Sequence, residues 1–333
     1  MTLLCDATHD PAGWTSADIG GKDGLTRRMT AAQLAALDEL VAATQHIAPD
    51  EITRADFDHP VINAMMDAAR ETIMAGHGAV ILAGADVAAL GIENFKRVYW
   101  GLGTHLGQGA VQSYRRDRIG HVRKEKDNPT GRGYLMDSEL ISHTDFHEIL
   151  SLASVSKPLS GGESGIVSSI AIHNIIRQER PDLIAPLYAG YYHESAGGTV
   201  SESKVPVFGC VDGRVSCYFH MPFVFNAAKR LGQPLPADFL EAMRFMSKVA
   251  TRPEVRADFT LEPGEMLFWH NFTALHSREA FVDTPEQTRL LLRLWINVPD
   301  GRPLPAAFHE RAAYMDRVHE AGEAAIDYAA ERV

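Results

Sequence analysis

Histidine and aspartate side chains that could bind a metal ion lie two positions apart in His143-Thr144-Asp145. In an extended segment, residues i and i+2 point to the same side, so His143 and Asp145 can face one ion while Thr144 points away. The triplet alone carries little weight. With 15 histidines and 43 acidic residues in the chain, chance would supply about two such H-x-[DE] triplets, although this is the one example present.

A third metal ligand is expected at His276, where an apolar strand ends near Trp269, a short turn follows and His276 opens the next strand. His270, six residues earlier, is a rival ligand. Two histidines and one carboxylate leave coordination positions open, which suits Fe(II) oxygen chemistry. Two alternatives remain at this point, namely a zinc hydrolase with the same three ligands and a cupin-like binding protein without turnover.

Two arginines favour an anion site beside this metal site. Arg289 and Arg293 enclose a run of three leucines, and on an extended chain both project from one face of the strand. Burying an unpaired guanidinium costs several kcal/mol, so two inward arginines predict an anionic partner. A planar guanidinium binds a carboxylate through two hydrogen bonds. The alternative is that both arginines are solvated on an exposed sheet face.

The elements that must position these residues are mainly strands. From residue 133 onward, short apolar runs are broken by turn residues, a pattern typical of a β-sandwich or jelly roll. Two helical inserts are predicted, at residues 171–188 with a break near Pro181, and at residues 236–251.

The remaining segments are predicted to be mostly helical. Helices are expected at residues 31–44, 60–76 and 92–106, with a buried strand at 79–82. The polar stretch 112–130 is expected to be a mobile loop. The tail, residues 306–333, is expected to be a helix that could cap the barrel or meet a second subunit to form a homo-oligomer.

Length and composition indicate one elaborated domain over residues 1–333. We divide it into a helical N-terminal elaboration (1–110), a core with helical inserts (111–300) and a C-terminal helix (301–333). Hydrophobic residues make up 45% and charged residues 23%, and neither a membrane-crossing segment nor a secretory signal is expected, so we predict a soluble, cytoplasmic protein. A net charge of -11 argues against nucleic-acid binding and favours a small-molecule ligand. Cys5, Cys210 and Cys217 are expected to be reduced thiols.

Five motifs in order carry a family resemblance. They are His143-Thr144-Asp145, Gly161-Gly162-Glu163-Ser164, Glu262-Pro263-Gly264-Glu265, His276 and the Arg289 to Arg293 segment. With them, the chain resembles the taurine dioxygenase family of Fe(II)/2-oxoglutarate oxygenases, within the clavaminate synthase-like superfamily. The resemblance spans residues 120–303 and is loose in the N-terminal third.

The resemblance implies a double-stranded β-helix, a cupin-like jelly roll whose mouth holds Fe(II) through His143, Asp145 and His276. It implies that 2-oxoglutarate chelates the iron and that Arg289 binds its far carboxylate. Ser164 stands where the family usually has Thr and would be the hydroxyl partner of that carboxylate. Arg293 matches a position that contacts substrate or co-substrate.

The implied reaction consumes O2 and 2-oxoglutarate, releases succinate and CO2, and oxidises a small, anionic or amino-acid-like substrate. Hydroxylation is the default outcome, while cyclisation, desaturation or oxidative decarboxylation would need the same metal residues. Relatives place substrate contacts in the polar segments that here contain Gln112, Tyr114 and Tyr134, although ordinary loop polarity explains these residues equally well. His147 lies two residues after Asp145, so on an extended chain its side chain points to the same side, and it is a further pocket candidate.

Overall fold

A mixed seven-stranded sheet forms the larger layer of the protein. The computed structural model describes residues 5–6, 8–113, 115–126, 128, 133–195 and 199–321. In spatial order the strands of the large sheet are β1 (Thr26–Arg28), β2 (Ala79–Ala83), β14 (Met266–His270), β6 (Ile149–Ser156), β17 (Leu290–Asn297) and β3 (Gln108–Gly109), and β4 (Gly120–Val122) also pairs with β17.

A four-stranded antiparallel sheet forms the second layer. Its order is β13 (Ala257–Phe259), β8 (Ser164–Ser168), β15 (Ala274–Arg278) and β5 (Leu140–His143). Leu150, Trp269 and Trp295 of the large sheet share one apolar core with Ile166 and Phe259 of the small sheet. Two facing sheets with flanking helices confirm the predicted jelly roll. Short ladders join β7 (Ser160–Gly161) to β16 (Phe281–Val282) and β9 (Glu194–Ser195) to β10 (Thr199–Val200).

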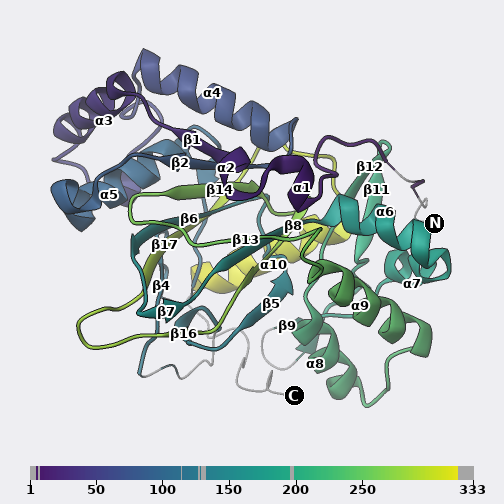
Figure 1. The fold of residues 1–333 in the computed structure, drawn as a ribbon. Coiled ribbons are helices and arrows are strands. Elements are labelled where there is room, and N and C mark those ends of the chain that lie inside the picture. Colours follow the sequence, from purple (N-terminus) through teal and green to yellow (C-terminus); the bar gives the residue numbers. More distant parts are fainter. Residues whose placement is uncertain are drawn as a thin grey trace.

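The central strands of the large sheet are buried on both faces, completely in β2 and β14 and over most of β6 and β17. On β17, Leu292 and Leu294 belong to the outer core, whereas Trp295 belongs to the core between the sheets. The outer face is covered by α3 (Ala31–Ala43), α4 (Pro60–Met74) and α5 (Val87–Thr104), as Figure 1 shows. This double burial explains why Leu290 to Leu292 form a continuous apolar run instead of an alternating one.

The N-terminal third is less purely helical than predicted. The three long helices and the strand at 79–83 agree with expectation, but β1 was not foreseen and pairs in parallel with β2. Two short helices, α1 (Ser16–Ile19) and α2 (Gly21–Leu25), precede β1, and a 3-10 turn, η1 (Pro49–Glu51), follows α3. The stretch 112–130 was predicted to be a loop, which is wrong for β4, because Leu291 to Arg293 of β17 supply hydrogen-bonding partners for it.

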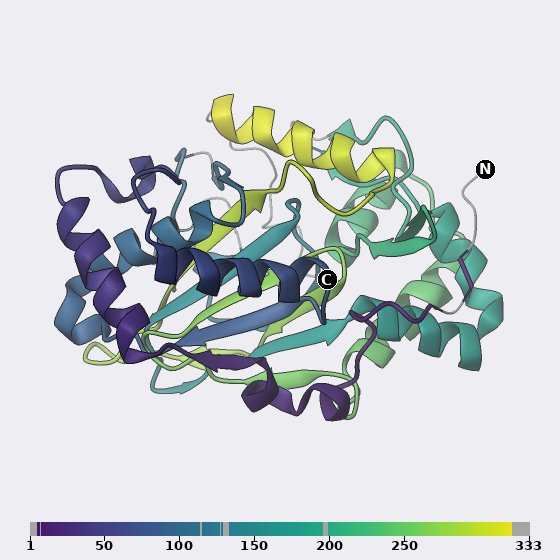
Figure 2. The same cartoon turned by 90° about the horizontal axis from the view of Figure 1, so that it is seen from above.

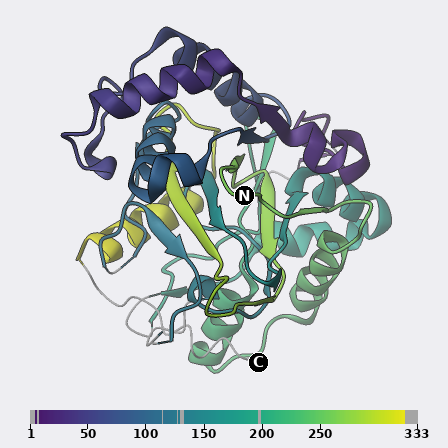
Figure 3. The ribbon, with the colours of Figure 1, turned by 60° about the vertical axis from the view of Figure 1, so that its left-hand side comes forward.

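The helical inserts pack together beside the strands and opposite α3 to α5 (Figures 1 and 3). The first insert consists of α6 (Ser169–Glu179), η3 (Pro181–Leu183) and α7 (Ile184–Ala189), with the predicted break at Pro181. The second is α9 (Ala237–Ala250). Helix α8 (Met221–Leu231) was not predicted, and the hairpin of β11 (Phe208–Val211) and β12 (Arg214–Cys217) completes this apolar core.

The C-terminal helix α10 (Ala306–Ala321) lies against the body of the molecule (Figure 2). Phe308, Met315 and Val318 enter the core between the sheets, so this helix caps the barrel. A role for it in oligomer formation stays a prediction, as does the assignment of the chain to one domain. None of the helices in the described ranges combines the length and apolar character that a membrane span requires.

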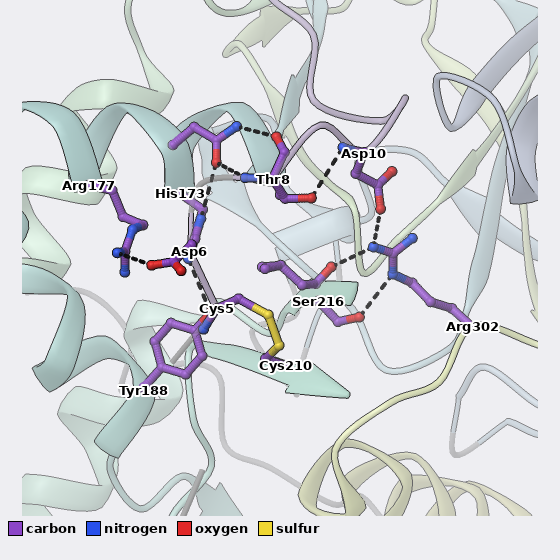
Figure 4. The surroundings of a disulfide bond; sticks show 12 residues. Cys5, Asp6, Thr8, Asp10, His173, Arg177, Tyr188, Cys210, Ser216 and Arg302 are labelled. Atoms are coloured by element: carbon purple, nitrogen blue, oxygen red, sulfur yellow. Dashed lines mark hydrogen bonds and ion pairs between the residues drawn. A yellow bond between two sulfur atoms is a disulfide. The ribbon is translucent and has the colours of Figure 1, made fainter. Parts of the chain in front are cut away.

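The prediction of three reduced cysteines is wrong for two of them, because Cys5 and Cys210 form a disulfide with a Cα to Cα separation of 5.8 Å (Figure 4). Cys217 is free and buried. The hairpin register pairs Cys210 with Val215, so Cys210 and Cys217 do not lie opposite each other. The disulfide partner was missed because it lies 205 residues away along the chain.

Further contacts hold the N-terminal segment on α6 and on the loop after β17. Asp6 forms an ion pair of 2.8 Å with Arg177, and the backbone N–H of Thr8 donates to the Asn174 side chain. The carboxylate of Asp10 pairs at 2.5 Å with Arg302, which is almost completely buried. Figure 4 shows these contacts around the disulfide.

Candidate active site

Three side chains that can bind a metal converge where the two sheets meet. His143, Asp145 and His276 each offer a ligand atom, and these atoms lie within 4.8 Å of one another. Strands β5 and β15 pair so that His143 lies directly opposite His276. The Nε2 atoms of both histidines lie 3.9 Å from oxygens of Asp145. His276 occupies the middle of β15 and does not open the strand, which corrects the predicted boundary.

Local hydrogen bonds orient this triad. The Nδ1 atom of His143 donates to the carbonyl of Ile141 at 2.7 Å, and this contact favours the tautomer whose Nε2 lone pair is free for a metal. The backbone of Asp145 exchanges two 3.0 Å hydrogen bonds with the side-chain amide of Asn271. The indole of Trp295 donates to the carboxylate of Asp145.

The charge states of the triad suit a divalent cation. Burial alone would raise the pKa of Asp145, but electrostatic interactions with His276, Arg293 and His143 lower it to about 2. Burial lowers the pKa of His276 to about 3. At neutral pH the group therefore presents an ionised carboxylate and a neutral imidazole, which are the protonation states that metal ligation requires.

The triad opens onto a cavity with aromatic walls and three arginines. The apolar part of its lining includes Phe146, Phe223, Trp269 and Trp295. The polar part contains Ser164, His220, Tyr134 and the three arginines Arg278, Arg289 and Arg293. Among the described lining residues, Asp145 is the one carboxylate, so cations dominate the cavity.

Arg289 enters the cavity just before β17 and is only 3% exposed. Its Nη1 atom has no hydrogen-bond partner among the described residues, and its guanidinium lies 5.2 Å from the centre of the Phe281 ring. Burial, followed by the charge of Arg278, lowers the pKa of Arg289 to about 9. The side chain is therefore cationic at neutral pH.

The Gly161-Gly162 turn makes room for Arg289 next to Ser164. Gly162 has a φ of +77°, and a Cβ there would lie 3.1 Å from Nε of Arg289. A side chain at this position would therefore be strained by the backbone and crowded by the arginine. Ser164 follows at the start of β8 and lines the same cavity.

Arg293 is held between two aromatic rings. Its guanidinium lies 4.6 Å from the ring centre of Tyr134 and 4.5 Å from that of Trp295. Nε donates to Oε1 of Gln112 at 2.8 Å, and Nη1 lies 3.9 Å from Oδ2 of Asp145. Stacking and the hydrogen bond to Gln112 thus hold the guanidinium beside the triad.

Gln112 contacts Arg293 and does not line the main cavity. The side chain is completely buried, and Nε2 donates to the carbonyls of Arg118 and Arg293 at 2.6 and 2.7 Å. Tyr134 lines the cavity. Tyr114, the remaining loop candidate, lies outside the described residues.

His147 and His270 are not placed with the triad. Nε2 of His147 contacts the carboxylate of Asp316 on α10 at 2.8 Å, and its ring stacks on Trp295. His270 pairs with Glu148 at 3.1 Å. Both histidines are buried in contacts with other elements and neither lines the cavity.

Sequence reasoning missed three polar cavity residues, namely His220, Ser277 and Arg278. Arg278 lies two positions after His276 on the same strand, so the two side chains point to the same face, and this pattern could have identified Arg278. His220 comes from the turn before α8, and no sequence pattern pointed to it. Its ring stacks on Phe223 at 3.7 Å and meets the ring of His143 edge-on at 5.5 Å.

Comparisons with known proteins agree with this architecture. Residues 39–295 match the family described as taurine catabolism dioxygenase TauD, TfdA family. FR-33289 synthase of Streptomyces rubellomurinus is 29% identical over 287 residues, which cover 81% of this chain and 85% of that protein. The taurine hydroxylase-like protein SAT17 of Stachybotrys chartarum is 26% identical over 312 residues, covering 87% and 80%.

Solved structures share the fold at lower identity. Asparagine oxygenase in complex with Fe(II), 2S,3S-3-hydroxyasparagine and succinate has a TM-score of 0.66 and 13% identity, covering 82% of this chain and 93% of that one. The non-heme iron oxygenase OrfP in complex with Fe and alpha-ketoglutaric acid has a TM-score of 0.60 and 16% identity, with the same coverage. At these identities the likeness concerns the fold alone.

Proposed function

The chain belongs to the taurine catabolism dioxygenase TauD, TfdA family, and on this premise we propose that it oxidises a small anionic substrate with Fe(II), O2 and 2-oxoglutarate. One observation carries the proposal. The His143, Asp145 and His276 side chains and the incompletely paired guanidinium of Arg289 line the same cavity. A metal site and an anion site are therefore available to one small molecule.

The triad fits Fe(II). Two imidazole nitrogens and one carboxylate oxygen lie on one side of the cavity, and this donor set with open positions is typical of non-haem iron oxygenases. In our proposal His143, Asp145 and His276 hold the ion. When bound, iron would supply O2 activation coupled to conversion of 2-oxoglutarate to succinate and CO2.

Arg289 and Ser164 fit the far carboxylate of 2-oxoglutarate. The buried Nη1 of Arg289 needs an acceptor, and a carboxylate provides one at the end of a five-carbon acid. Ser164 adds a hydroxyl donor to the lining of the same cavity. These two residues would orient the co-substrate so that its keto acid end points to the triad.

Arg293 is our candidate for the anionic group of the substrate. Its guanidinium lies beside Asp145 and is held there by Tyr134, Trp295 and Gln112. Since the described lining contains three arginines and no carboxylate besides Asp145, the cavity favours an acid over a group that carries an ammonium. Hydroxylation is the proposed outcome.

The two alternatives, a zinc hydrolase and a non-catalytic binding protein, have less support. A zinc hydrolase would not require a buried arginine without an anionic partner. Family membership also favours the oxygenase. Relatives differ in what they act on, since a uridine-5'-phosphate dioxygenase of Streptomyces matches this chain at 41% identity over only 71 residues. Substrate identity must therefore come from a screen.

The test is anaerobic addition of Fe(II) and 2-oxoglutarate to the purified protein. We expect the visible charge-transfer band of the chelated complex, followed under O2 by succinate release with particular sulfonates, phosphonates, phosphates or carboxylates. Asp145→Ala should give no band. The absence of both a band and 2-oxoglutarate binding in the unaltered protein would refute the proposal.

A further inference from the structure

Arg278 lies directly opposite Ser164 in the small sheet. Strands β15 and β8 pair in an antiparallel register that joins these two residues. Cross-strand partners project their side chains from the same face of a sheet. Both Arg278 and Ser164 line the cavity that Arg289 enters from the segment just before β17, so three polar donors from separate segments line one cavity.

The guanidinium of Arg278 is buried without full hydrogen bonding. The residue is 4% exposed, and Nη2 donates to the carbonyl of Ser138. Its Nε and Nη1 atoms, like Nη1 of Arg289, have no partner among the described residues. Buried donors without acceptors are costly, and a charged donor costs more. The arrangement therefore calls for an acceptor that is itself anionic.

One aromatic ring brings the two cations together. The guanidinium of Arg278 lies 5.1 Å from the ring centre of Phe281, and that of Arg289 lies 5.2 Å from the same centre. Phe281 offers no negative charge, and the described residues place no carboxylate in an ion pair with either arginine. Two like charges in one buried region repel each other, and an anion between them would relieve that repulsion.

We propose that Arg278 and Arg289 together bind the far carboxylate of 2-oxoglutarate, with Ser164 as the third donor. This inference rests on the proposed function and adds a residue to it. A carboxylate has two oxygens and about four acceptor positions, which suffices for two guanidinium groups and a hydroxyl. The pair selects co-substrates by the far carboxylate, because a 2-oxo acid without one leaves both arginines unpaired.

The test compares two co-substrates by titration of the anaerobic Fe(II) complex. 2-Oxoglutarate has the far carboxylate, and 2-oxobutyrate has the same chelating end without it. We expect Arg278→Met to raise the Kd for 2-oxoglutarate roughly 10- to 100-fold, as the loss of charged hydrogen bonds does, and to leave the Kd for 2-oxobutyrate within about 2-fold. Arg278→Lys should give an intermediate Kd for 2-oxoglutarate.

A matched control is Arg256→Met, which removes an arginine that pairs with Asp258 and Glu279 outside the cavity lining. It should leave both Kd values unchanged. Circular dichroism and iron content report whether each variant is folded, and 2-oxoglutarate-dependent thermal stabilisation provides a second readout of binding.

The outcomes separate this inference from the function on which it rests. If the unaltered protein binds no 2-oxoglutarate, both are overturned. If it binds 2-oxoglutarate and Arg278→Met binds it equally well, the role of Arg278 is overturned and the proposed function stands. An equal loss of affinity for both co-substrates would assign Arg278 a structural role and would also overturn the inference.

Discussion

The indole Nε1 of Trp295 donates a 3.1 Å hydrogen bond to Oδ2 of Asp145. Trp295 lies on β17 in the large sheet, whereas Asp145 follows β5 in the small sheet. The same carboxylate oxygen lies 3.9 Å from Nη1 of Arg293, two residues earlier on β17. The strand that carries the proposed substrate arginine therefore also orients the proposed carboxylate ligand.

Trp295→Phe should weaken iron binding by about 10- to 100-fold, the usual effect of losing a hydrogen bond to a metal ligand. Anaerobic Fe(II) titration measures the change. Trp269→Phe is the matched control, because Trp269 lines the same cavity and its Nε1 has no partner among the described residues. Equal losses in both variants would show that the indole volume matters and the hydrogen bond does not.

Arg289→Ala should abolish the 2-oxoglutarate band while the protein still binds iron, because Arg289 contacts none of the triad. Arg293→Ala should instead raise the KM for substrate and uncouple 2-oxoglutarate consumption from product formation. Iron content, band intensity and the ratio of succinate to product separate the two effects. Negligible effects of both substitutions would contradict their assignment to the site.

Gln112→Met should raise the KM for substrate about 10-fold with little change in the Kd for 2-oxoglutarate, since a charged hydrogen bond is typically worth 1.5–3 kcal/mol. Gln112 accepts from Nε of Arg293 and does not line the main cavity, so its effect should pass through the arginine. In an Arg293→Ala background the same substitution should add little. Additive effects in the double variant would exclude this positioning role.

His173 should make the stability of the metal-free protein depend on pH between about 4 and 6.5. Burial lowers the pKa of His173 from its ordinary 6.5 to about 4. The unfolded chain therefore binds the extra proton first as pH falls, so the contribution is complete above pH 6.5 and is lost towards pH 4. The loss should be on the order of 3 kcal/mol.

Urea unfolding at pH 7.5 and 5 measures this effect. His173→Gln should show a smaller loss of unfolding free energy between the two pH values than the unaltered protein. Other buried histidines contribute equally to both proteins, so the difference isolates His173. Identical losses would contradict the low pKa.

Cys5→Ser should lower the free energy of unfolding by about 2–4 kcal/mol, because the disulfide closes a long loop in the unfolded chain. Thiol reductant should destabilise the unaltered protein by a similar amount and leave Cys5→Ser unchanged. Neither treatment should alter the 2-oxoglutarate Kd, since neither cysteine lines the cavity. A reductant effect on the serine variant would point to a different target.

The candidate site could be predicted where its signals are local along the chain. His143 and Asp145 are two residues apart, and Arg289 and Arg293 share a strand face, so simple side-chain alternation identified them. Trp295 is different, because its role depends on a hydrogen bond to Asp145 between strands that are distant in sequence. Strand register between distant segments is not encoded in any short pattern.

In the fold as well, features with local sequence signals were predicted, and features that depend on the pairing of distant segments were not. Helix α3 begins at the Thr30 capping box and α4 begins at Pro60, while α4 and α9 each bury one apolar face, so the positions of all three were predicted to within a few residues. Strand β1 is only three residues long, and the Cys5 to Cys210 disulfide spans 205 positions. Both depend on pairing between remote parts of the chain, which composition and periodicity do not report.

Strand β2 limits how far the protein can be shortened. It lies between β1 and β14 in the large sheet and hydrogen-bonds to both. A truncated chain beginning at residue 111 would keep every proposed metal and co-substrate residue, but β14 would become a bare edge beside an uncovered apolar face. Such edges pair with strands from other molecules. We therefore expect that fragment to aggregate even though it retains all the proposed site residues.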